Sequence, residues 1–220
     1  MQCSNRLRNF ALAGALGVWT LVVAMGFGRL WRYSGTPGRA ARVATWPAEC
    51  PLRPAGHGAT LVLAIHPQCP CSAATIGELA ELMAVRSPSG EMATAYALFV
   101  EPSGEKPQHS ATWDSASAIP GVKVIADVGG RLSAQFGAQT SGQVYAFDPR
   151  GELLFCGGIT PARGHMGDSV GTDAIREILH GRAASQHEAP VFGCALGKPP
   201  LQQQSGNRQT TVAGVNVGSD

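Results

Sequence analysis

The chain has 220 residues, of which 44% are hydrophobic and 15% are charged. A chain of this length buries one core of ordinary size, so we expect one folded domain with appended segments. Its formal net charge is only +2, and beyond the first forty residues no segment concentrates lysine or arginine. Because nucleic-acid-binding proteins carry a basic patch or stripe, the sequence excludes nucleic acid as a partner.

An uncharged and strongly apolar segment spans residues 9–28, with arginines beyond both ends. Twenty residues of α-helix rise about 30 Å, which matches the hydrocarbon core of a bilayer. We therefore predict that residues 1–33 form a membrane anchor that crosses the bilayer through residues 9–28. A cleaved signal peptide is the alternative, because Ala24 and Gly26 are small residues of the kind found at cleavage sites. Both interpretations export the remainder of the chain.

Two opposing signals bear on the orientation of this anchor. The positive-inside rule opposes a cytoplasmic N-terminus, because four arginines follow the span: Arg29, Arg32, Arg39 and Arg42. The cysteines favour it, because five of the six lie beyond the span, and redox or metal chemistry with one structural bridge explains such a set in an oxidising compartment. Since five is odd, at least one of these thiols is free or joined to another molecule. We expect a single-pass protein of the bacterial inner membrane whose domain faces the periplasm.

The segment from residue 34 to residue 58 is rich in proline and glycine and has no apolar period, which is typical of a linker. The folded domain is expected over residues 59–182. Residues 183–220 form a tail, and the polar composition after residue 200 is typical of disorder.

The domain opens with a continuous apolar run at residues 60–65, which is typical of a strand buried on both faces. Apolar residues then recur at helical spacing. We expect Ser72 to cap this helix, Glu78 and Glu81 to lie on its polar side, and the helix to end by Pro88.

Later in the domain, strands are predicted at residues 93–100, 122–126, 143–147 and 152–156, and helices at residues 112–118, 131–136 and 173–180. Turn residues between the last two strands indicate a hairpin. Strands that alternate with helices and then end in a hairpin imply a mixed central sheet with helices on its faces. The predicted fold class is therefore α/β.

Two cysteines, Cys69 and Cys71, flank Pro70 at the junction between the first strand and its helix. The positive end of a helix dipole stabilises a thiolate and so lowers the pKa of a nearby thiol. A Cys-x-Cys pair closes a small ring whose disulfide is strained and easily reduced. Redox or metal-linked chemistry is the favoured interpretation, and a structural thiol beside a bystander is the alternative. Exposure on the loop favours Cys69 as the nucleophile, whereas the helix dipole favours Cys71.

The strand, the cysteine turn, the helix and the later hairpin resemble the thioredoxin-like superfamily, in its membrane-tethered bacterial redoxin branch. Within it the chain is most similar to exported proteins labelled RedB, through His66 to Cys71, the Arg163-Gly164-His165 loop and residues 191–194. The resemblance implies a three-layer sandwich over residues 59–182, with active-site cysteines at Cys69 and Cys71. It also implies a thiol-disulfide oxidoreductase that acts on disulfides or thiols of proteins or small molecules. No cofactor is expected.

The chain departs from that family at two places. One residue separates the cysteines where the family usually has two, and Thr140-Ser141-Gly142 stands where the family has a cis-proline. Because that proline guides the substrate backbone, its absence weighs against ordinary exchange with protein partners. The peroxiredoxin pattern is also missing around Cys69, which weighs against peroxidase activity.

A metal site built from His66, Cys69 and Cys71 is the alternative. The spacing His-x-x-Cys-x-Cys puts three soft or borderline ligands on one turn, and such ligands suit Cu(I) or Zn(II). A copper-binding or copper-delivery protein of thioredoxin fold is therefore the second hypothesis. In the third, the cysteines only stabilise the fold.

Further residues are expected to support the site. Arg163 and His165 belong to a glycine-rich loop and are available to stabilise a thiolate. Cys194 lies on the tail and is a candidate resolving thiol, with three partners left open: Cys69, Cys71 and Cys156. On a predicted strand, Cys156 itself is more typical of a core thiol.

Overall fold

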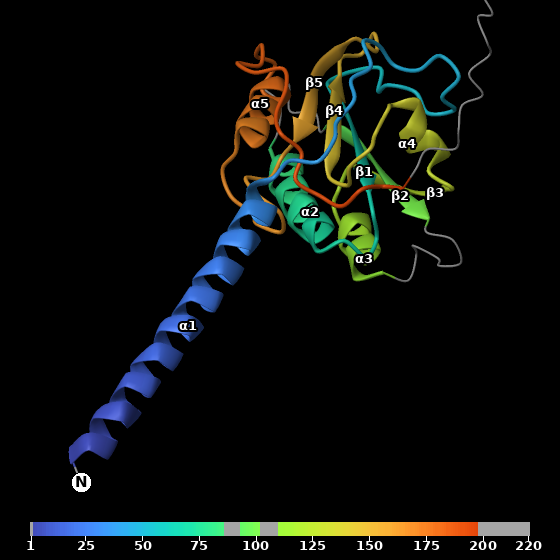
Figure 1. Cartoon of the computed structure of the whole chain (residues 1–220). Helices are drawn as coiled ribbons and strands as arrows, with labels where there is room; N and C mark the ends of the chain where they lie inside the picture. The colour runs from blue at the N-terminus through green and yellow to red at the C-terminus, as the bar shows by residue number, and fades with distance from the viewer. Residues whose placement is uncertain (1, 86–92, 102–109, 198–220) are drawn as a thin grey trace, which may run out of the picture.

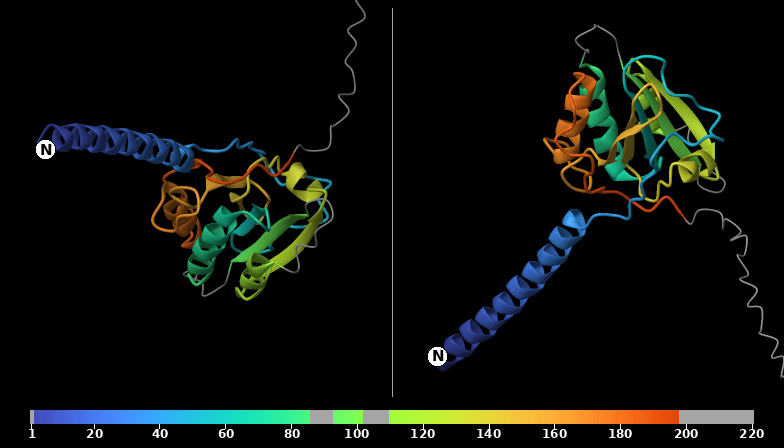
Figure 2. Two further views of the ribbon diagram at one scale, coloured as in Figure 1. Left: turned by 60° about the horizontal axis from the view of Figure 1, so that its bottom comes forward. Right: turned by 90° about the horizontal axis from the view of Figure 1, so that it is seen from above.

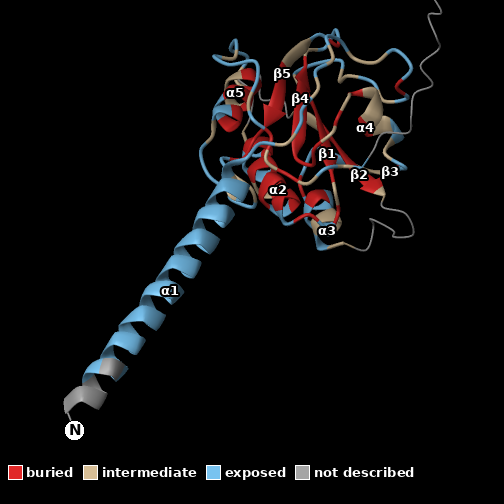
Figure 3. Cartoon of the chain, viewed as in Figure 1, coloured by how far each residue is buried: buried red, intermediate tan, exposed pale blue. Residues whose placement is uncertain are grey.

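The computed structural model describes residues 2–85, 93–101 and 110–197 (Figure 1). Helix α1 spans Gln2–Gly35 and projects away from the rest of the molecule. Its apolar side chains from Phe10 to Phe27 are exposed to solvent all round, as Figure 3 shows. A helix that is apolar on every side is suited to the interior of a membrane. Helix α1 is therefore long and apolar enough to cross one.

A mixed sheet of five strands lies at the centre of the domain, in the order β3-β2-β1-β4-β5. Strand β1 is parallel to β2 and antiparallel to β4, while β3 extends the parallel side and β5 completes a hairpin with β4. The strands are β1 (Thr60–Ile65), β2 (Thr94–Glu101), β3 (Val122–Val128), β4 (Gln143–Phe147) and β5 (Leu153–Gly158). The predicted mixed sheet and its closing hairpin are confirmed.

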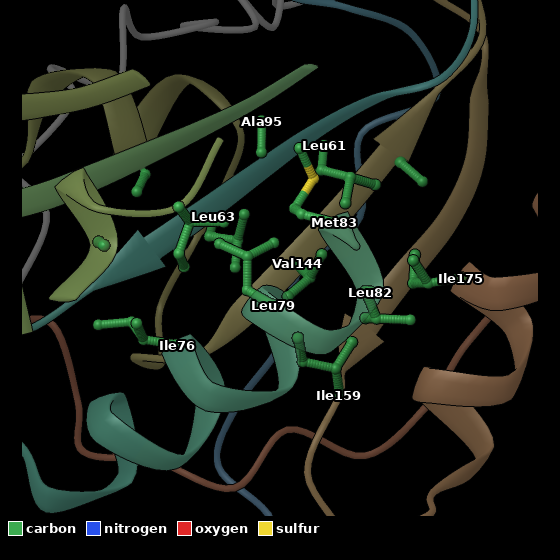
Figure 4. Packing of buried hydrophobic residues seen from close by; sticks show 14 of the residues in the cluster. Leu61, Leu63, Ile76, Leu79, Leu82, Met83, Ala95, Val144, Ile159 and Ile175 are labelled. Carbon is green, nitrogen blue, oxygen red and sulfur yellow. The ribbon is translucent and has the colours of Figure 1, made fainter. Parts of the chain in front are cut away.

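Three helices cover one face of this sheet: α2 (Pro70–Met83), α3 (Ala111–Ser117) and α5 (Val170–Leu179). In Figure 4, Leu79 and Leu82 of α2 point toward Leu63 and Val144 on the sheet, and Ile175 of α5 closes the cluster. All five side chains are buried. Burying each such aliphatic side chain contributes roughly 2 kcal/mol, so α2 is held firmly over the ends of β1 and β4.

The opposite face is covered by α4 (Arg131–Gln135) and by the chain that follows α1. Trp46 packs edge-on against Phe136 and Phe147, with ring centroids 5.2 and 5.0 Å apart. Its backbone N–H also donates to Gly151 at 2.7 Å. Trp46 therefore packs in the core, although it belongs to the predicted linker of residues 34–58. An isolated core residue in a segment without regular secondary structure produces no apolar periodicity, so the sequence gives no sign of this contact.

Helix α2 differs from the prediction at its start. Cys69 is the N-cap residue and Pro70 the first helical residue, whereas Ser72 lies inside the helix and does not cap it. Proline is well suited to the first helical position because its missing N–H needs no partner there. Glu81 is exposed as expected, but Glu78 is only 3% exposed, and its carboxylate accepts the Gly167 N–H at 2.6 Å.

Helix α5 begins at Val170, three residues before the predicted start, because Ser169 and Thr172 form a capping box. The following chain runs back across the domain to lie beside the chain after α1, as both views in Figure 2 show. The Gly38 N–H donates to Val191 there at 2.7 Å. Helix α2 ends at Met83, which confirms the prediction that it ends by Pro88. The disorder predicted after residue 200 lies outside the described residues, and the domain boundaries stay a prediction.

Candidate active site

The turn between β1 and α2 carries the two cysteines of the predicted site. Cys69 has an extended backbone, with φ −82° and ψ 123°, and Pro70 starts the helix immediately after it. Both thiols are buried, since Cys69 is 3% exposed and Cys71 is 6% exposed. Both cysteines also lie at the N-terminus of a 14-residue helix, where unpaired N–H groups and the helix dipole favour negative charge.

Ser141 fastens this turn to the start of β4. Its side-chain oxygen accepts the His66 N–H at 2.8 Å and lies 2.9 Å from the hydroxyl of Ser72. The Ser72 hydroxyl also donates to the His66 carbonyl at 2.7 Å. Every peptide bond in the described chain is trans, including that of Ser141, at the place where the family has its cis-proline. A serine side chain thus joins the two loops that meet at the cysteines.

A short segment of the tail, residues 191–196, lies along the same loop, and we call it the C-terminal strap. The Ser141 N–H donates to the Cys194 carbonyl at 2.8 Å, and the Leu196 N–H donates to Gln139 at 3.0 Å. Thr140 and Ala195 face each other in an antiparallel bridge. A Cβ atom on Gly193 would overlap the Ser141 carbonyl oxygen, so glycine permits this close approach. The strap is therefore attached like an added strand.

The strap brings a third thiol to the two in the turn. The Sγ atoms of Cys69 and Cys194 lie 2.9 Å apart. Burial is the largest influence on the Cys69 thiol and opposes its ionisation. Hydrogen bonds from Cys194 and from Cys71 nevertheless outweigh burial, and the pKa of Cys69 is lowered. Cys69 is therefore the thiol that ionises first.

The pKa values of the other two thiols shift in the opposite direction. Burial, and then the neighbouring charge and hydrogen bond of Cys69, raise the pKa of Cys71. The same two causes raise the pKa of Cys194 to about 11. Because the pKa is lowered for Cys69 and raised for its two neighbours, the arrangement favours Cys69 over Cys71 as the nucleophile.

Arg163 joins the site to the end of α1. Its guanidinium donates to the Gly193 carbonyl of the strap, to Tyr33 at 3.1 Å and to Thr36 at 3.2 Å. The guanidinium also lies over the Tyr33 ring, 4.7 Å from its centroid. Its positive charge lowers the pKa of both Cys71 and Cys194, against the larger effect of burial. The structure thus brings Arg163 to the cysteines.

The remaining predicted residues are placed differently. His165 is exposed, and its Nδ1 lies 2.7 Å from the Arg163 carbonyl of its own loop. His66 is half-buried, and its Nδ1 accepts the Gln68 N–H at 3.3 Å. Cys156 is a core thiol on the other face of the sheet, where it donates to the Ala41 carbonyl at 3.3 Å. The structure therefore pairs Cys194 with Cys69 and not with Cys156.

No group of three or more histidine, cysteine, aspartate or glutamate side chains in the described part of the chain is placed to hold a metal ion. Copper binding by His66, Cys69 and Cys71 stays a prediction. The residues that the sequence left unassigned at the site are Ser141 and Gly193. The departure from the cis-proline pattern pointed to the first, whereas nothing local pointed to the second.

Comparisons with known proteins show which solved structures resemble this chain. No family model and no curated protein matches the chain. A hypothetical protein from Sinorhizobium meliloti is 18% identical with a TM-score of 0.52, and the match covers 74% of this chain and 96% of that one. An uncharacterised conserved protein from Geobacillus kaustophilus is 17% identical with a TM-score of 0.50, over 76% and 93% of the two chains.

A third solved structure, the MTB dsbF protein in its mixed oxidised and reduced forms, is 17% identical with a TM-score of 0.39, over 56% and 78% of the two chains. At identities this low, the two matches with TM-scores of 0.50 and 0.52 indicate a shared fold alone. The sheet order β2-β1-β4-β5, with β4 antiparallel and a helix after each of β1 and β5, is the thioredoxin-like arrangement, extended here by β3. The chain therefore has a thioredoxin-like fold.

Proposed function

We propose that this protein is a membrane-anchored thiol-disulfide oxidoreductase of the RedB-like redoxin branch, acting through Cys69, Pro70 and Cys71 at the N-terminus of α2. One observation carries the proposal. Cys69 is a helix N-cap thiol whose pKa is lowered by hydrogen bonds from neighbouring thiols. Catalytic and redox cysteines need such a stabilised thiolate, whereas structural buried cysteines do not.

The reaction follows from that thiolate. Cys69 attacks one sulfur of a substrate disulfide, a mixed disulfide forms, and the other substrate sulfur leaves as a thiolate. A second thiol of the site then attacks the Cys69 sulfur and releases the remaining substrate thiolate. The protein loses two electrons and the substrate gains two, so a dithiol reductant restores the starting state. Substrates are disulfides of proteins or small molecules.

The anchor gives this chemistry a location. If α1 crosses the bacterial inner membrane with the domain in the periplasm, Arg163 holds the cysteine site against the end of the span through Tyr33 and Thr36. The site then lies close to the membrane surface. Partners at or in the membrane are therefore within its reach.

The proposal is tested by redox titration of the full-length protein in detergent, with free thiols located by mass spectrometry. We expect a reversible two-electron couple that includes Cys69, at a potential well above about −300 mV, the range of structural disulfides. A Cys69 that stays reduced across the titration contradicts the proposal. If such a protein instead binds one Cu(I) and loses it on His66→Ala substitution, the copper hypothesis takes its place.

A further inference from the structure

The C-terminal strap holds Cys194 in direct contact with the predicted nucleophile, although 125 residues separate them in the chain. Three hydrogen bonds fix the strap near this thiol: two pair it with the loop before β4, and the third comes from Arg163 to Gly193. Each is made by the backbone of the strap. The position of Cys194 is therefore a property of the fold.

We propose that Cys194 is the resolving thiol of this site, and that the internal disulfide of the catalytic cycle is Cys69–Cys194. Cys71 is then a positioning residue, which donates its S–H to the Cys69 thiolate. This inference rests on the proposed oxidoreductase function, and it names which second thiol completes the reaction.

Geometry favours Cys194 over Cys71. A disulfide bond is about 2.0 Å long, so the two sulfurs at 2.9 Å need to approach by roughly 1 Å. Cys71, by contrast, belongs to the first turn of α2, after a proline of restricted φ. The Cys69 carbonyl accepts the Ser72 N–H at 2.9 Å, and the Cys71 carbonyl accepts the Thr75 hydroxyl at 3.1 Å. A disulfide between Cys69 and Cys71 would strain this hydrogen-bonded turn. A disulfide between Cys69 and Cys194 requires a movement of the strap and leaves the turn unchanged.

The charges give the two steps an order. In the reduced protein, burial and the Cys69 thiolate keep Cys194 protonated, with a pKa of about 11. Once Cys69 carries the substrate as a mixed disulfide, its negative charge is gone, and that part of the effect on Cys194 disappears. The nearby Arg163 guanidinium then favours the Cys194 thiolate. Cys194 thus becomes a nucleophile after Cys69 has reacted.

The resolving step balances without an added reagent. The Cys194 thiolate attacks Sγ of Cys69, the bond from Cys69 to the substrate sulfur breaks, and the substrate leaves as a thiolate that takes up the proton lost by Cys194. Two protein thiols have become one disulfide, and one substrate disulfide has become two thiols.

The test uses reduced full-length protein in detergent and one equivalent of dithiobis(nitrobenzoate), a small disulfide that releases one coloured thiolate at each step. All variants carry Cys3→Ser, and Cys69→Ser measures the background. Wild-type protein should release two equivalents, and peptide mapping should find Cys69 joined to Cys194. In Cys194→Ser the first release should persist, while the second slows by about tenfold or more and the adduct stays on Cys69.

Cys71→Ser is the matched variant. Its first release should slow by about threefold, because a donor to the Cys69 thiolate has changed, but no adduct should accumulate. If the adduct accumulates in Cys71→Ser and not in Cys194→Ser, Cys71 resolves, and the inference is wrong while the oxidoreductase function stands. If wild-type protein releases no more thiolate than Cys69→Ser, the proposed function itself fails.

A second pair of variants moves the strap and keeps every cysteine. Gly193→Val forces the strap away from the Ser141 carbonyl, so the second release should slow by about tenfold. Ala195→Val creates the same side chain at an exposed position two residues later, and both releases should stay within about twofold of wild type. Resolution at the wild-type rate in Gly193→Val would overturn the inference, because the strap would then not position the thiol.

Discussion

The Arg163 guanidinium donates to the carbonyl oxygen of Gly193, the residue immediately before Cys194. The same side chain bonds the end of α1 at Tyr33 and Thr36. The half-buried Arg163 side chain therefore contacts both the end of α1 and the strap beside the cysteine site. The Gly38 N–H adds a second link, because it donates to Val191 of the strap at 2.7 Å.

Replacing this arginine should weaken the site in two ways. Arg163→Gln removes a positive charge that lowers the pKa of Cys71 and Cys194, so both pKa values should rise. It also removes a donor to the strap, and we expect resolution of the Cys69 adduct to slow by about tenfold. Stopped-flow measurement of the second thiolate release checks this. Arg176→Gln, on the exposed face of α5, is the control and should behave as wild type.

The reactivity of Cys69 should extend to lower pH than that of an ordinary thiol. Its lowered pKa means that the thiolate persists as the pH falls, so the alkylation rate should reach half of its plateau below the pH of an ordinary thiol. Cys194→Ala removes a donor and should shift this midpoint upward, whereas Cys194→Ser keeps an O–H donor and should shift it less. Iodoacetamide labelling at a series of pH values, read by mass spectrometry, measures both. Equal midpoints in all three proteins would show that Cys194 does not stabilise the thiolate.

Ser141 should contribute measurably to stability. Ser141→Ala leaves the His66 N–H without its acceptor and the Ser72 hydroxyl oxygen without the O–H that Ser141 donates to it. Leaving buried polar groups unpaired costs about 1–3 kcal/mol each, so the free energy of unfolding should fall by roughly 2 kcal/mol. Urea denaturation followed by circular dichroism gives the value. Ser115→Ala, at an exposed position of α3, should change it by less than about 0.5 kcal/mol.

Trp46 should stabilise the domain although it lies in the predicted linker. Trp46→Ala removes three edge-to-face contacts, with Tyr96, Phe136 and Phe147, and should cost about 3 kcal/mol in the same unfolding experiment. Trp31→Ala, on the exposed surface of α1, is the matched control and should cost nothing in the domain. A domain begun at residue 59 should be destabilised for the same reason. Equal effects of the two substitutions would mean that Trp46 is not part of the core.

The predicted orientation can be tested separately. An alkaline phosphatase fused after residue 197 should be active in intact bacteria if the domain faces the periplasm, because that reporter needs disulfides to fold. It should also remain in the membrane fraction if the anchor is retained. A soluble and active fusion would indicate that the first segment is a cleaved signal peptide.

Local sequence patterns determined much of this protein. The apolar segment 9–28, the buried run 60–65 and the turn residues before the last strand correctly predicted a helix able to span a membrane and a mixed sheet with a closing hairpin. They also predicted that Cys69 and Cys71 lie near the N-terminus of a helix, although the exact start of that helix was wrong. Each of these features depends on neighbours within one turn, one strand or one hairpin, so residue spacing is enough to reveal it.

Only the tertiary structure decided which thiols meet. The contact between Cys69 and Cys194 depends on the strap returning across the domain to pair with Ser141, and no local pattern encodes a pairing over that separation. The burial of Glu78 depends in the same way on an N–H from Gly167, in a distant loop. The packing of Trp46 requires the assembled face of the sheet. These features arise when separate elements dock, because only then do residues without periodic spacing acquire neighbours.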